Sequence, residues 1–402
     1  MAEQPQAQAN GAGPLHGVKV IDLTEHMAGP FCTMILADMG AEVFKVERPG
    51  KGDSSRAMGD GSPRNPYFRY INRNKKGLTL DYKKPEGREI FLKLVRQMDV
   101  LVENYRPTVM PRAALGYEEL SRVNPRLIYA QLSGFGFDGP YAGQGGFDLI
   151  AQGMGGIMHV TGEPDGPPTS VGLPICDLGT GMWGTSGILA ALFDRTRTGK
   201  GQRVECSLLE TAIGFSSWTS AGWLADHKEP VRQGSRHRQN APYQRLSTQD
   251  GYIMVGAANQ NIWTRFARAL DHPQWIEDPR FNSSRNRMAN RQALEQEIEA
   301  VLATADTARW IAVLNEAGVP CGPVNGYNQL FNDPQVLHRQ MVVYVPDEEL
   351  GEAPHIRTPI RMLSGVAVRN TAPRLGQHNE EVLGWLGYSR AEIDELHDKQ
   401  VI

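Results

Sequence analysis

The sequence predicts an α/β protein whose large domain contains a parallel sheet and whose second, smaller domain is of the α+β class. Three observations support this. The chain has 402 residues, and a single hydrophobic core rarely serves a chain of that length. Residues 17–47 have the pattern of a strand, a helix and a strand, a unit whose two strands run parallel. After residue 225 the pattern changes to a basic, loop-like segment followed by a strand and several helices.

The large domain is predicted to begin with residues 15–225. Short β-branched runs predict its strands, and Ala- and Leu-rich runs that end at glycine predict its helices. The expected strands are 17–23, 41–47, 78–82, 99–103, 127–132 and 203–206, and the expected helices are 29–39, 85–97, 149–158, one whose first turn is at Asp177, and 208–225.

A dinucleotide-binding turn is not expected, although Glu47 ends the second strand where a ribose-binding acid could lie. The first turn, residues 24–30 (TEHMAGP), has no GxGxxG pattern. It therefore lacks the glycines that let a pyrophosphate approach the backbone. NAD binding is thus disfavoured.

The smaller domain is predicted over residues 226–320, with a strand at 252–256 and helices at 261–270, 291–303 and 307–317. Residues 321–402 are predicted to form a return linker and the C-terminal part of the large domain. Strands at 341–345 and 360–363 and a polar C-terminal helix are expected there. Residues 1–14 are predicted to be a disordered tail, because they lack the basic and apolar regions of a signal peptide.

Composition excludes several classes of function. The net charge is −3 with both signs interspersed, which gives no general attraction for nucleic acid or an anionic membrane. No apolar run approaches the ~20 residues of a membrane span. The four cysteines have no CxxC spacing, so neither a metal site nor a disulfide scaffold is predicted. The expected compartment is the reducing cytoplasm.

Asp177 is the candidate catalytic residue. It lies at the start of a predicted helix, where a carboxylate can cap the backbone or, held still by the same geometry, attack an acyl carbon. Four glycines follow at 179, 181, 184 and 187, each weakening a helix by roughly 0.5–1 kcal/mol. Something must therefore come close to this backbone. Asp148 is a second carboxylate candidate, which could equally cap a helix of its own.

Basic residues recur where predicted strands end, at Arg48, Lys83, Arg106 and Arg112. Ligands gather at the carboxyl ends of strands in open α/β sheets. The repetition indicates a groove for a polyphosphate or polycarboxylate. The alternative is an ordinary exposed charged face.

Ten strings in a fixed order resemble the class III CoA-transferases, the family that includes formyl-CoA transferase and carnitine CoA-transferase. The resemblance covers residues 15–402. Its strings are LHGVKVIDLTEHMAGP, LADMGAEVFKVERPGKGD, NRNKKGLTLDYK, VLVENYRP, GGFDLIAQGMGG, TGEPDGPP, DLGTGMWGTSGILAAL, TGKGQ, GVPCGPV and LGQHNEEVL.

The resemblance implies that Asp177 attacks an acyl-CoA thioester and carries CoA as an aspartyl thioester. No permanently bound cofactor is implied, since the CoA thioesters are substrates. It also implies a Rossmann-like large domain, with two chains interlocked as a homodimer whose active site draws on both. The implied CoA contacts are Met27, Ala28, Arg48, Leu80, Asp81, Tyr82, Lys83, Asn104, Tyr105 and Arg112, while Arg106 stands where formyl-CoA transferase has glycine.

The substrate acids are less defined. Met27 and Met58 replace the active-site Gln and Trp of formyl-CoA transferase, and the tetraglycine loop is missing, so oxalate with formyl-CoA is not expected. We expect succinyl-CoA or a similar donor and a small carboxylic or dicarboxylic acceptor. Arg236, His237 and Arg238 could bind a second carboxylate, or could simply be a solvated loop.

Two other classes of protein stay open. An α-methylacyl-CoA racemase would share this fold and the aspartate, but Phe147 occupies the place of its histidine base and cannot take a proton. A non-catalytic acyl-CoA binder would need Asp177 only as a cap.

Overall fold

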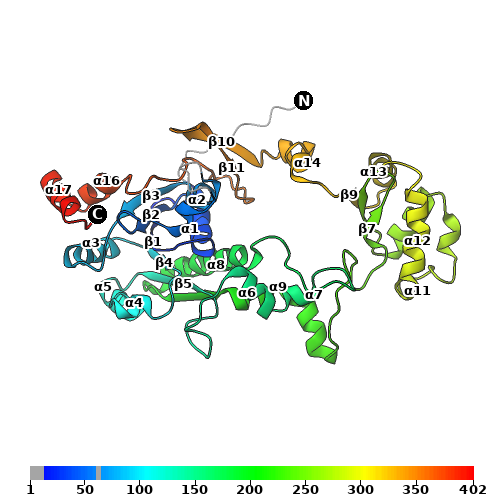
Figure 1. Ribbon diagram of the computed structural model, residues 1–402, viewed down its shortest axis with the longest axis horizontal. Coiled ribbons are helices and arrows are strands. Elements are labelled where there is room, and N and C mark those ends of the chain that lie inside the picture. The colour runs from blue at the N-terminus through cyan, green and yellow to red at the C-terminus, as the bar shows by residue number, and fades with distance from the viewer. Residues whose placement is uncertain (1–12, 60–64) are drawn as a thin grey trace. The chain divides into compact units, whose positions relative to one another are not determined.

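The computed structural model describes residues 13–59 and 65–402. It divides them into two compact units (Figure 1). The large unit contains the described residues up to Ile157, Ser170–Leu224 and Leu337–Ile402, and the small unit contains Met158–Thr169 and Ala225–Val336. Residues 1–12 of the predicted tail lie outside the described residues. Pro14 begins a turn, after which Leu15 donates a hydrogen bond to Met39.

The large unit contains the predicted parallel sheet. Its described strands are β1 (Lys19–Asp22), β2 (Glu42–Glu47), β3 (Lys75–Thr79), β4 (Val100–Glu103), β5 (Ile128–Ser133) and β6 (Arg203–Ser207). Their order is β3-β2-β1-β4-β5-β6, and all neighbours pair parallel. The order reverses between β1 and β4, which makes this the topological switch point. The predicted α/β class is confirmed.

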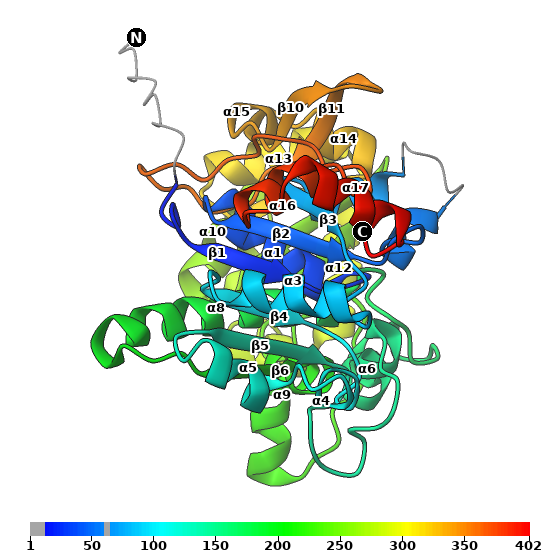
Figure 2. The same ribbon diagram turned by 90° about the vertical axis from the view of Figure 1, so that its left-hand side faces the viewer.

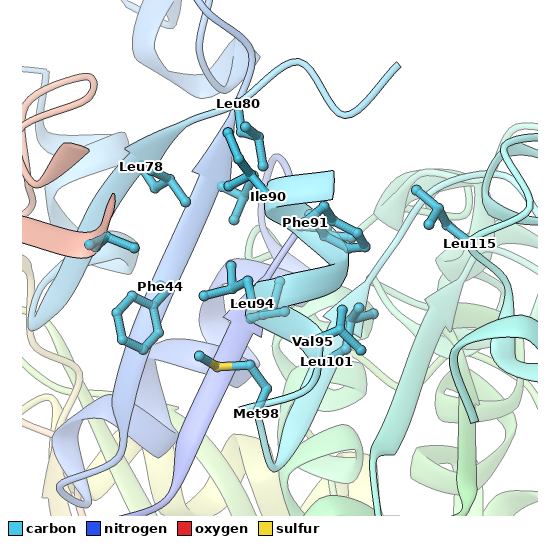
Figure 3. Packing of buried hydrophobic residues seen from close by; sticks show 14 of the residues in the cluster. Phe44, Leu78, Leu80, Ile90, Phe91, Leu94, Val95, Met98, Leu101 and Leu115 are labelled. Atoms are coloured by element: carbon cyan, nitrogen blue, oxygen red, sulfur yellow. The ribbon is translucent and has the colours of Figure 1, made fainter. Parts of the chain in front are cut away.

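Helices cover both faces of this sheet (Figure 2). The first face is covered by α3 (Pro85–Val95), α5 (Tyr117–Val123), α16 (Asn379–Trp385) and α17 (Arg390–Asp398). The second is covered by α1 (Ala28–Asp38) and α8 (Ile175–Thr198). Alternation along the strands explains the two cores: Ile21 packs on the first face and Val20 on the second. Figure 3 shows side chains of α3 packed against strand residues such as Phe44 and Leu101.

The other helices of the large unit are short or interrupted. The predicted helix 149–158 is instead split at Gly155-Gly156, because Gly156 has a φ of +81°. The remaining elements of the large unit are η1 (Ser54–Ala57), α2 (Pro66–Asn72), α4 (Val109–Arg112), α6 (Asp148–Met154) and α9 (Leu208–Asp226), whose last two residues belong to the small unit. Helix α7 (Ile157–Val160) begins at the boundary and continues into the small unit.

Two predicted strands of the large unit differ from the structure: one is displaced and the other is absent. The strand predicted at 78–82 is β3, which begins at Lys75 because Lys75–Thr79 pair with β2. The strand predicted at 360–363 has no regular structure. Instead, β10 (Val342–Asp347) pairs antiparallel with β11 (Gly351–Ile356), whose Gly, Pro and Glu residues hid it from pattern analysis.

The small unit has an antiparallel sheet of β7 (Tyr243–Ser247), β8 (Tyr252–Gly256) and β9 (Cys321–Pro323). Its core surrounds Trp263 and Phe266. Because β9 pairs with β8, residues 321–336 belong to this unit and not to the return linker. Its helices are α10 (Gln260–Ala269), η2 (Pro273–Ile276), α11 (Ser284–Ala289), α12 (Arg291–Leu302), α13 (Thr307–Glu316), α14 (Tyr327–Phe331) and α15 (Pro334–His338). No helix in the described part of the chain has both the length and the apolar character of a membrane span.

Candidate active site

The candidate site begins at the switch point, where the turns after β1 and β4 are joined by a pair of hydrogen bonds. The backbone N–H of Glu25 donates to Oδ1 of Asn104 over 2.9 Å, and Nδ2 of Asn104 donates to the carbonyl of Glu25 over 2.8 Å. The amide of Asn104, which the resemblance makes a CoA contact, thus holds the neighbouring turn. Ligands of open α/β sheets bind in this crevice.

The other implied CoA contacts follow the carboxyl ends of β1 to β4, so the structure brings most of them to one edge of the sheet. Met27 and Ala28 start α1, and exposed Arg48 follows β2. Exposed Lys83 lies beyond the end of β3, and Arg106 directly after the Asn104–Tyr105 turn. Arg112 is exposed on the short helix α4.

Two residues of the stretch after β3 have structural roles. Leu80 is buried in the first-face core, so its side chain cannot face a ligand. Oδ1 of Asp81 accepts the N–H of Lys83 over 3.1 Å and shapes the turn. Tyr82 and Tyr105 are partly buried, and burial raises the pKa of both phenols. Both remain neutral hydrogen-bond donors at physiological pH.

Asp177 lies in the first turn of α8 but does not cap it. The cap position is Pro174, and Asp148 of α6 supplies the oxygen: its Oδ1 accepts the N–H of Cys176 over 2.8 Å and that of Asp177 over 3.2 Å. The interpretation of Asp177 as a helix cap is therefore wrong, and Asp148 caps α8 in its place. The carboxylate of Asp177 makes no hydrogen bond to any described residue.

The surroundings of Asp177 penalise its ionised form. Burial is the larger cause and the nearby charge of Asp148 the second, and together they raise the pKa of Asp177 from 3.8 to about 7. Burial likewise raises the pKa of the neighbouring Cys176 thiol to about 12, so this sulfur stays protonated. A perturbed carboxyl without a partner is typical of a functional site.

The four glycines after Asp177 serve packing within the protein. A Cβ on Gly181 would lie 2.8 Å from the carbonyl oxygen of Ala28 in α1, and one on Gly184 would meet Cys32 and Leu132. Gly179 and Gly187 face Phe215 and Val204 in the same way. The close approach to this backbone that the glycines predict is thus made by neighbouring helices and strands of this chain. The four glycines are therefore not ligand contacts.

This packing sets Asp177 beside the switch-point crevice. Gly181 lies about one helical turn after Asp177 and touches the start of α1, where the implied CoA contacts Met27 and Ala28 lie. Ala28 and Cys176 share one buried cluster. The ring of His26 also meets that of Phe147 edge to face at 6.2 Å, which brings the turn after β1 to the residue before Asp148. Sequence analysis did not identify His26.

The predicted substrate cations lie in the small unit. Arg236 already pairs with Glu295, Nη2 to Oε2 at 2.8 Å. His237 stacks on Tyr243 at 4.8 Å. The guanidinium of Arg238 donates to the carbonyl of Val231 over 2.9 Å and has no carboxylate partner among the described residues. Of the three, Arg238 therefore has the charge most available to a ligand.

No group of three or more His, Cys, Asp or Glu side chains suited to a metal ion occurs among the residues that the structure describes.

Comparison with known proteins identifies the family. Residues 15–379 match the CoA-transferase family III. The human succinyl-CoA:glutarate CoA-transferase is 36% identical over 99% of this chain and 92% of its own. The acetyl-CoA:oxalate CoA-transferase of Acetobacter aceti is 41% identical over 83% of this chain and 87% of its own. The crystal structure of a CAIB/BAIF family protein from Brucella suis is 36% identical, with a TM-score of 0.83 over 93% of this chain and all of that one. The chain therefore belongs to CoA-transferase family III, and it is an enzyme that transfers CoA.

Proposed function

We propose that this enzyme moves CoA from succinyl-CoA or a similar donor to a small carboxylic or dicarboxylic acid, with Asp177 as the carrier of CoA. One observation carries the proposal: the carboxylate of Asp177 is partly buried, has no hydrogen-bond partner among the described residues, and lies beside the crevice between β1 and β4. A side chain in this state can approach an acyl carbon without breaking a bond of its own.

The transfer takes four steps. A carboxylate oxygen of Asp177 attacks the donor thioester; the C–S bond breaks, and CoA thiolate leaves an aspartyl anhydride. The thiolate then attacks the aspartyl carbon and releases the donor acid. The acceptor carboxylate attacks this aspartyl-CoA thioester and expels the thiolate, leaving a second anhydride. The thiolate finally attacks the acceptor acyl carbon, which gives the new acyl-CoA and restores Asp177.

Each step develops an oxyanion that needs a donor. The N–H groups of Cys176 and Asp177 are occupied by Asp148, and those of the glycines at 179–187 lie inside helix α8, where the helix's own carbonyls accept them. By contrast, no described residue accepts a hydrogen bond from the amides of Gly145 and Gly146. We assign the oxyanion donors to this loop, which leads directly into Phe147 and Asp148.

The choice of acid rests on the relatives and on one arginine. The relatives at 35–41% identity include enzymes named for succinyl-CoA with glutarate, mesaconate or D-citramalate. A dicarboxylate acceptor needs a cation for its second carboxylate, and the guanidinium of Arg238 has the spare donors. Arg236 is the weaker choice because Glu295 already neutralises it.

We also propose a homodimer and a cytoplasmic location. The large unit exposes large apolar side chains on α8 and α9, among them Trp183 (52% exposed), Phe193 (67%) and Trp218 (77%). Apolar surface of this extent on neighbouring helices favours a subunit interface. All four cysteines are free thiols, in keeping with a reducing compartment.

Trapping of the carrier tests the mechanism. The enzyme is mixed with radiolabelled acyl-CoA, quenched with hydroxylamine or borohydride, and digested to locate the modified residue. We expect modification at Asp177 in the wild type and none in Asp177→Asn. An Asn variant that moves CoA between acids as fast as the wild type would refute the proposal.

A further inference from the structure

The turn Thr24–His26, between β1 and α1, is held almost entirely by side chains. Five consecutive backbone groups, from the N–H of Thr24 to the N–H of His26, each bond to a side chain from another position. Their partners, in chain order, are Asp22 (2.9 Å), Lys45 (2.8 Å), Asn104 for both groups of Glu25 (2.9 and 2.8 Å), and Asp53 (3.4 Å).

The turn needs this support because His26 has a φ of +67°. A residue other than glycine rarely adopts this left-handed conformation, which persists only where the surroundings over-determine it. The turn leads directly into Met27 and Ala28, the start of α1.

Lys45 and Asp53 bond to each other as well as to the turn, and neither has a role described above. Lys45 is fully buried on β2, and its Nζ bonds both the carbonyl of Thr24 and Oδ2 of Asp53, each over 2.8 Å. Oδ1 of Asp53 accepts the N–H groups of Ser55 (2.8 Å) and His26. A charged lysine between Phe44 and Val46 of a buried strand is a costly choice, since apolar residues in place of a buried pair are often neutral or stabilising. The pair therefore calls for a reason other than stability.

We propose that Lys45 and Asp53 are positioning residues for CoA: they fix the turn Thr24–His26 in the one conformation that presents Met27 and the start of α1 to the ligand. This inference rests on the proposed function, because it takes the crevice between β1 and β4 as the CoA site. Neither residue contacts CoA. Their role is to lower the conformational freedom that binding would otherwise have to remove.

The chain offers a matched control at the opposite edge of the sheet. Arg73 and Asp38 form a second fully buried pair, Nη2 to Oδ2 at 2.7 Å. Asp38 ends α1 and Arg73 precedes β3, so this pair lies at the amino edge, away from the crevice. Lys45→Met with Asp53→Asn, and Arg73→Met with Asp38→Asn, each remove one buried pair without leaving an unpaired charge.

The experiment measures the dissociation constant of CoA by calorimetry, with kcat, KM and Tm of both double variants. We expect CoA binding to weaken about tenfold or more in the Lys45/Asp53 variant and less than about twofold in the Arg73/Asp38 variant. The KM for acyl-CoA should follow the CoA affinity while kcat at saturation changes little. The Tm values show whether the two variants differ in stability, and where the change in Tm is the same in both, stability alone cannot produce the difference in CoA binding.

Equal weakening in both variants, or unchanged CoA binding in a folded Lys45/Asp53 variant, would overturn the inference. If that double variant does not fold, Asp53→Glu replaces it, because a glutamate keeps a negative charge opposite Lys45 while its longer side chain displaces the oxygen that accepts the N–H of His26. About threefold weaker CoA binding is then expected, and unchanged binding refutes the inference. Binding of CoA does not require acylation, so the trapping result at Asp177 can fail independently. If both Arg48→Ala and the Lys45/Asp53 variant bind CoA like the wild type, the proposed CoA crevice is wrong as well.

Discussion

Asp148→Asn is expected to shift the pH dependence of enzyme acylation to lower pH. Asp177 must be ionised to attack, and its pKa of about 7 means that acylation should rise with pH through neutrality. The charge of Asp148 is the second cause of this raised pKa, after burial. Asparagine removes the charge while its Oδ1 can still accept the N–H groups of Cys176 and Asp177, and the variant gives up only the bond that Nε2 of Gln152 donates to Oδ2 over 2.6 Å.

The size of the effect follows from the pKa. Raising the pKa of Asp177 from 3.8 to about 7 means that its ionised form is disfavoured by about 4 kcal/mol. At pH 6 about one wild-type active site in ten is then ionised, against about nine in ten at pH 8. If the variant's midpoint falls to 6 or below, half or more of its sites are ionised at pH 6, and acylation there becomes at least about fivefold faster.

Rapid-quench measurement of the first acylation, from pH 5 to 9, reads the midpoint directly. Asp194→Asn is the control: it removes a carboxylate from the same helix, but roughly 25 Å further along the axis, well beyond the Debye length of ~10 Å. Its midpoint should equal that of the wild type. A wild-type midpoint near 4, or an unmoved midpoint in Asp148→Asn, would refute the electrostatic argument.

Three further predictions follow from single contacts. Gly181→Ala should lower the free energy of unfolding in urea by roughly 1–3 kcal/mol, because the new Cβ would lie 2.8 Å from the Ala28 carbonyl oxygen. Gly384→Ala is the control: this glycine has open space around it, so its substitution should be neutral or slightly stabilising. Equal effects of the two substitutions would contradict the prediction. Glu103→Gln should stabilise the protein at pH 8 by up to about 3 kcal/mol, and this gain should vanish towards pH 4.5. Burial raises the pKa of Glu103 to about 7 in the folded protein, so the unfolded chain releases this proton at lower pH. The stability of the wild type therefore falls as pH rises from 4.5 to 7. The prediction fails if urea titrations at the two pH values show the same difference between variant and wild type. Arg238→Ala should raise KM for dicarboxylates several-fold more than KM for monocarboxylates. Arg236→Ala, which breaks an ion pair with Glu295, should instead act mainly on Tm. Equal effects of Arg238→Ala on KM for both classes of acid would contradict a role of Arg238 in substrate binding.

The parallel sheet could be predicted because its strands are short, apolar and separated by helices. Buried parallel strands such as Val100–Glu103 and Ile128–Ser133 are apolar on both faces, which local patterning detects. The paired strand Gly351–Ile356 could not be detected, because its pairing with Val342–Asp347 compensates for a sequence that resembles a turn. The boundary of the small unit was missed for the same reason: it depends on β9 pairing with a strand more than sixty residues earlier.

In the candidate site, too, features that depend on a local pattern could be predicted from the sequence, and features that depend on distant contacts could not. Asp177 could be named as a candidate from the sequence because an acid at a helix start followed by glycines forms a local pattern. The capping role of Asp148 was missed because its hydrogen bonds reach across 29 residues to Asp177. Lys45 offered a signal, a lysine within the strand EVFKVE, but only the fold reveals that its Nζ lies against the turn after β1. Contacts between distant segments cannot be inferred from one sequence's periodicity.

The two carboxylates at the start of α8 also bear on the energies of the proposed intermediates. Burial and the charge of Asp148 disfavour Asp177 only while it is ionised. An anhydride or a thioester at Asp177 is neutral at that position, so acylation relieves the penalty of about 4 kcal/mol that the free carboxylate carries. The environment that keeps Asp177 half protonated at pH 7 therefore favours the acylated enzyme over the ionised one. On this argument Asp148→Asn should speed acylation at low pH and yet lower the fraction of enzyme that stands acylated at high pH, where the wild type is fully ionised.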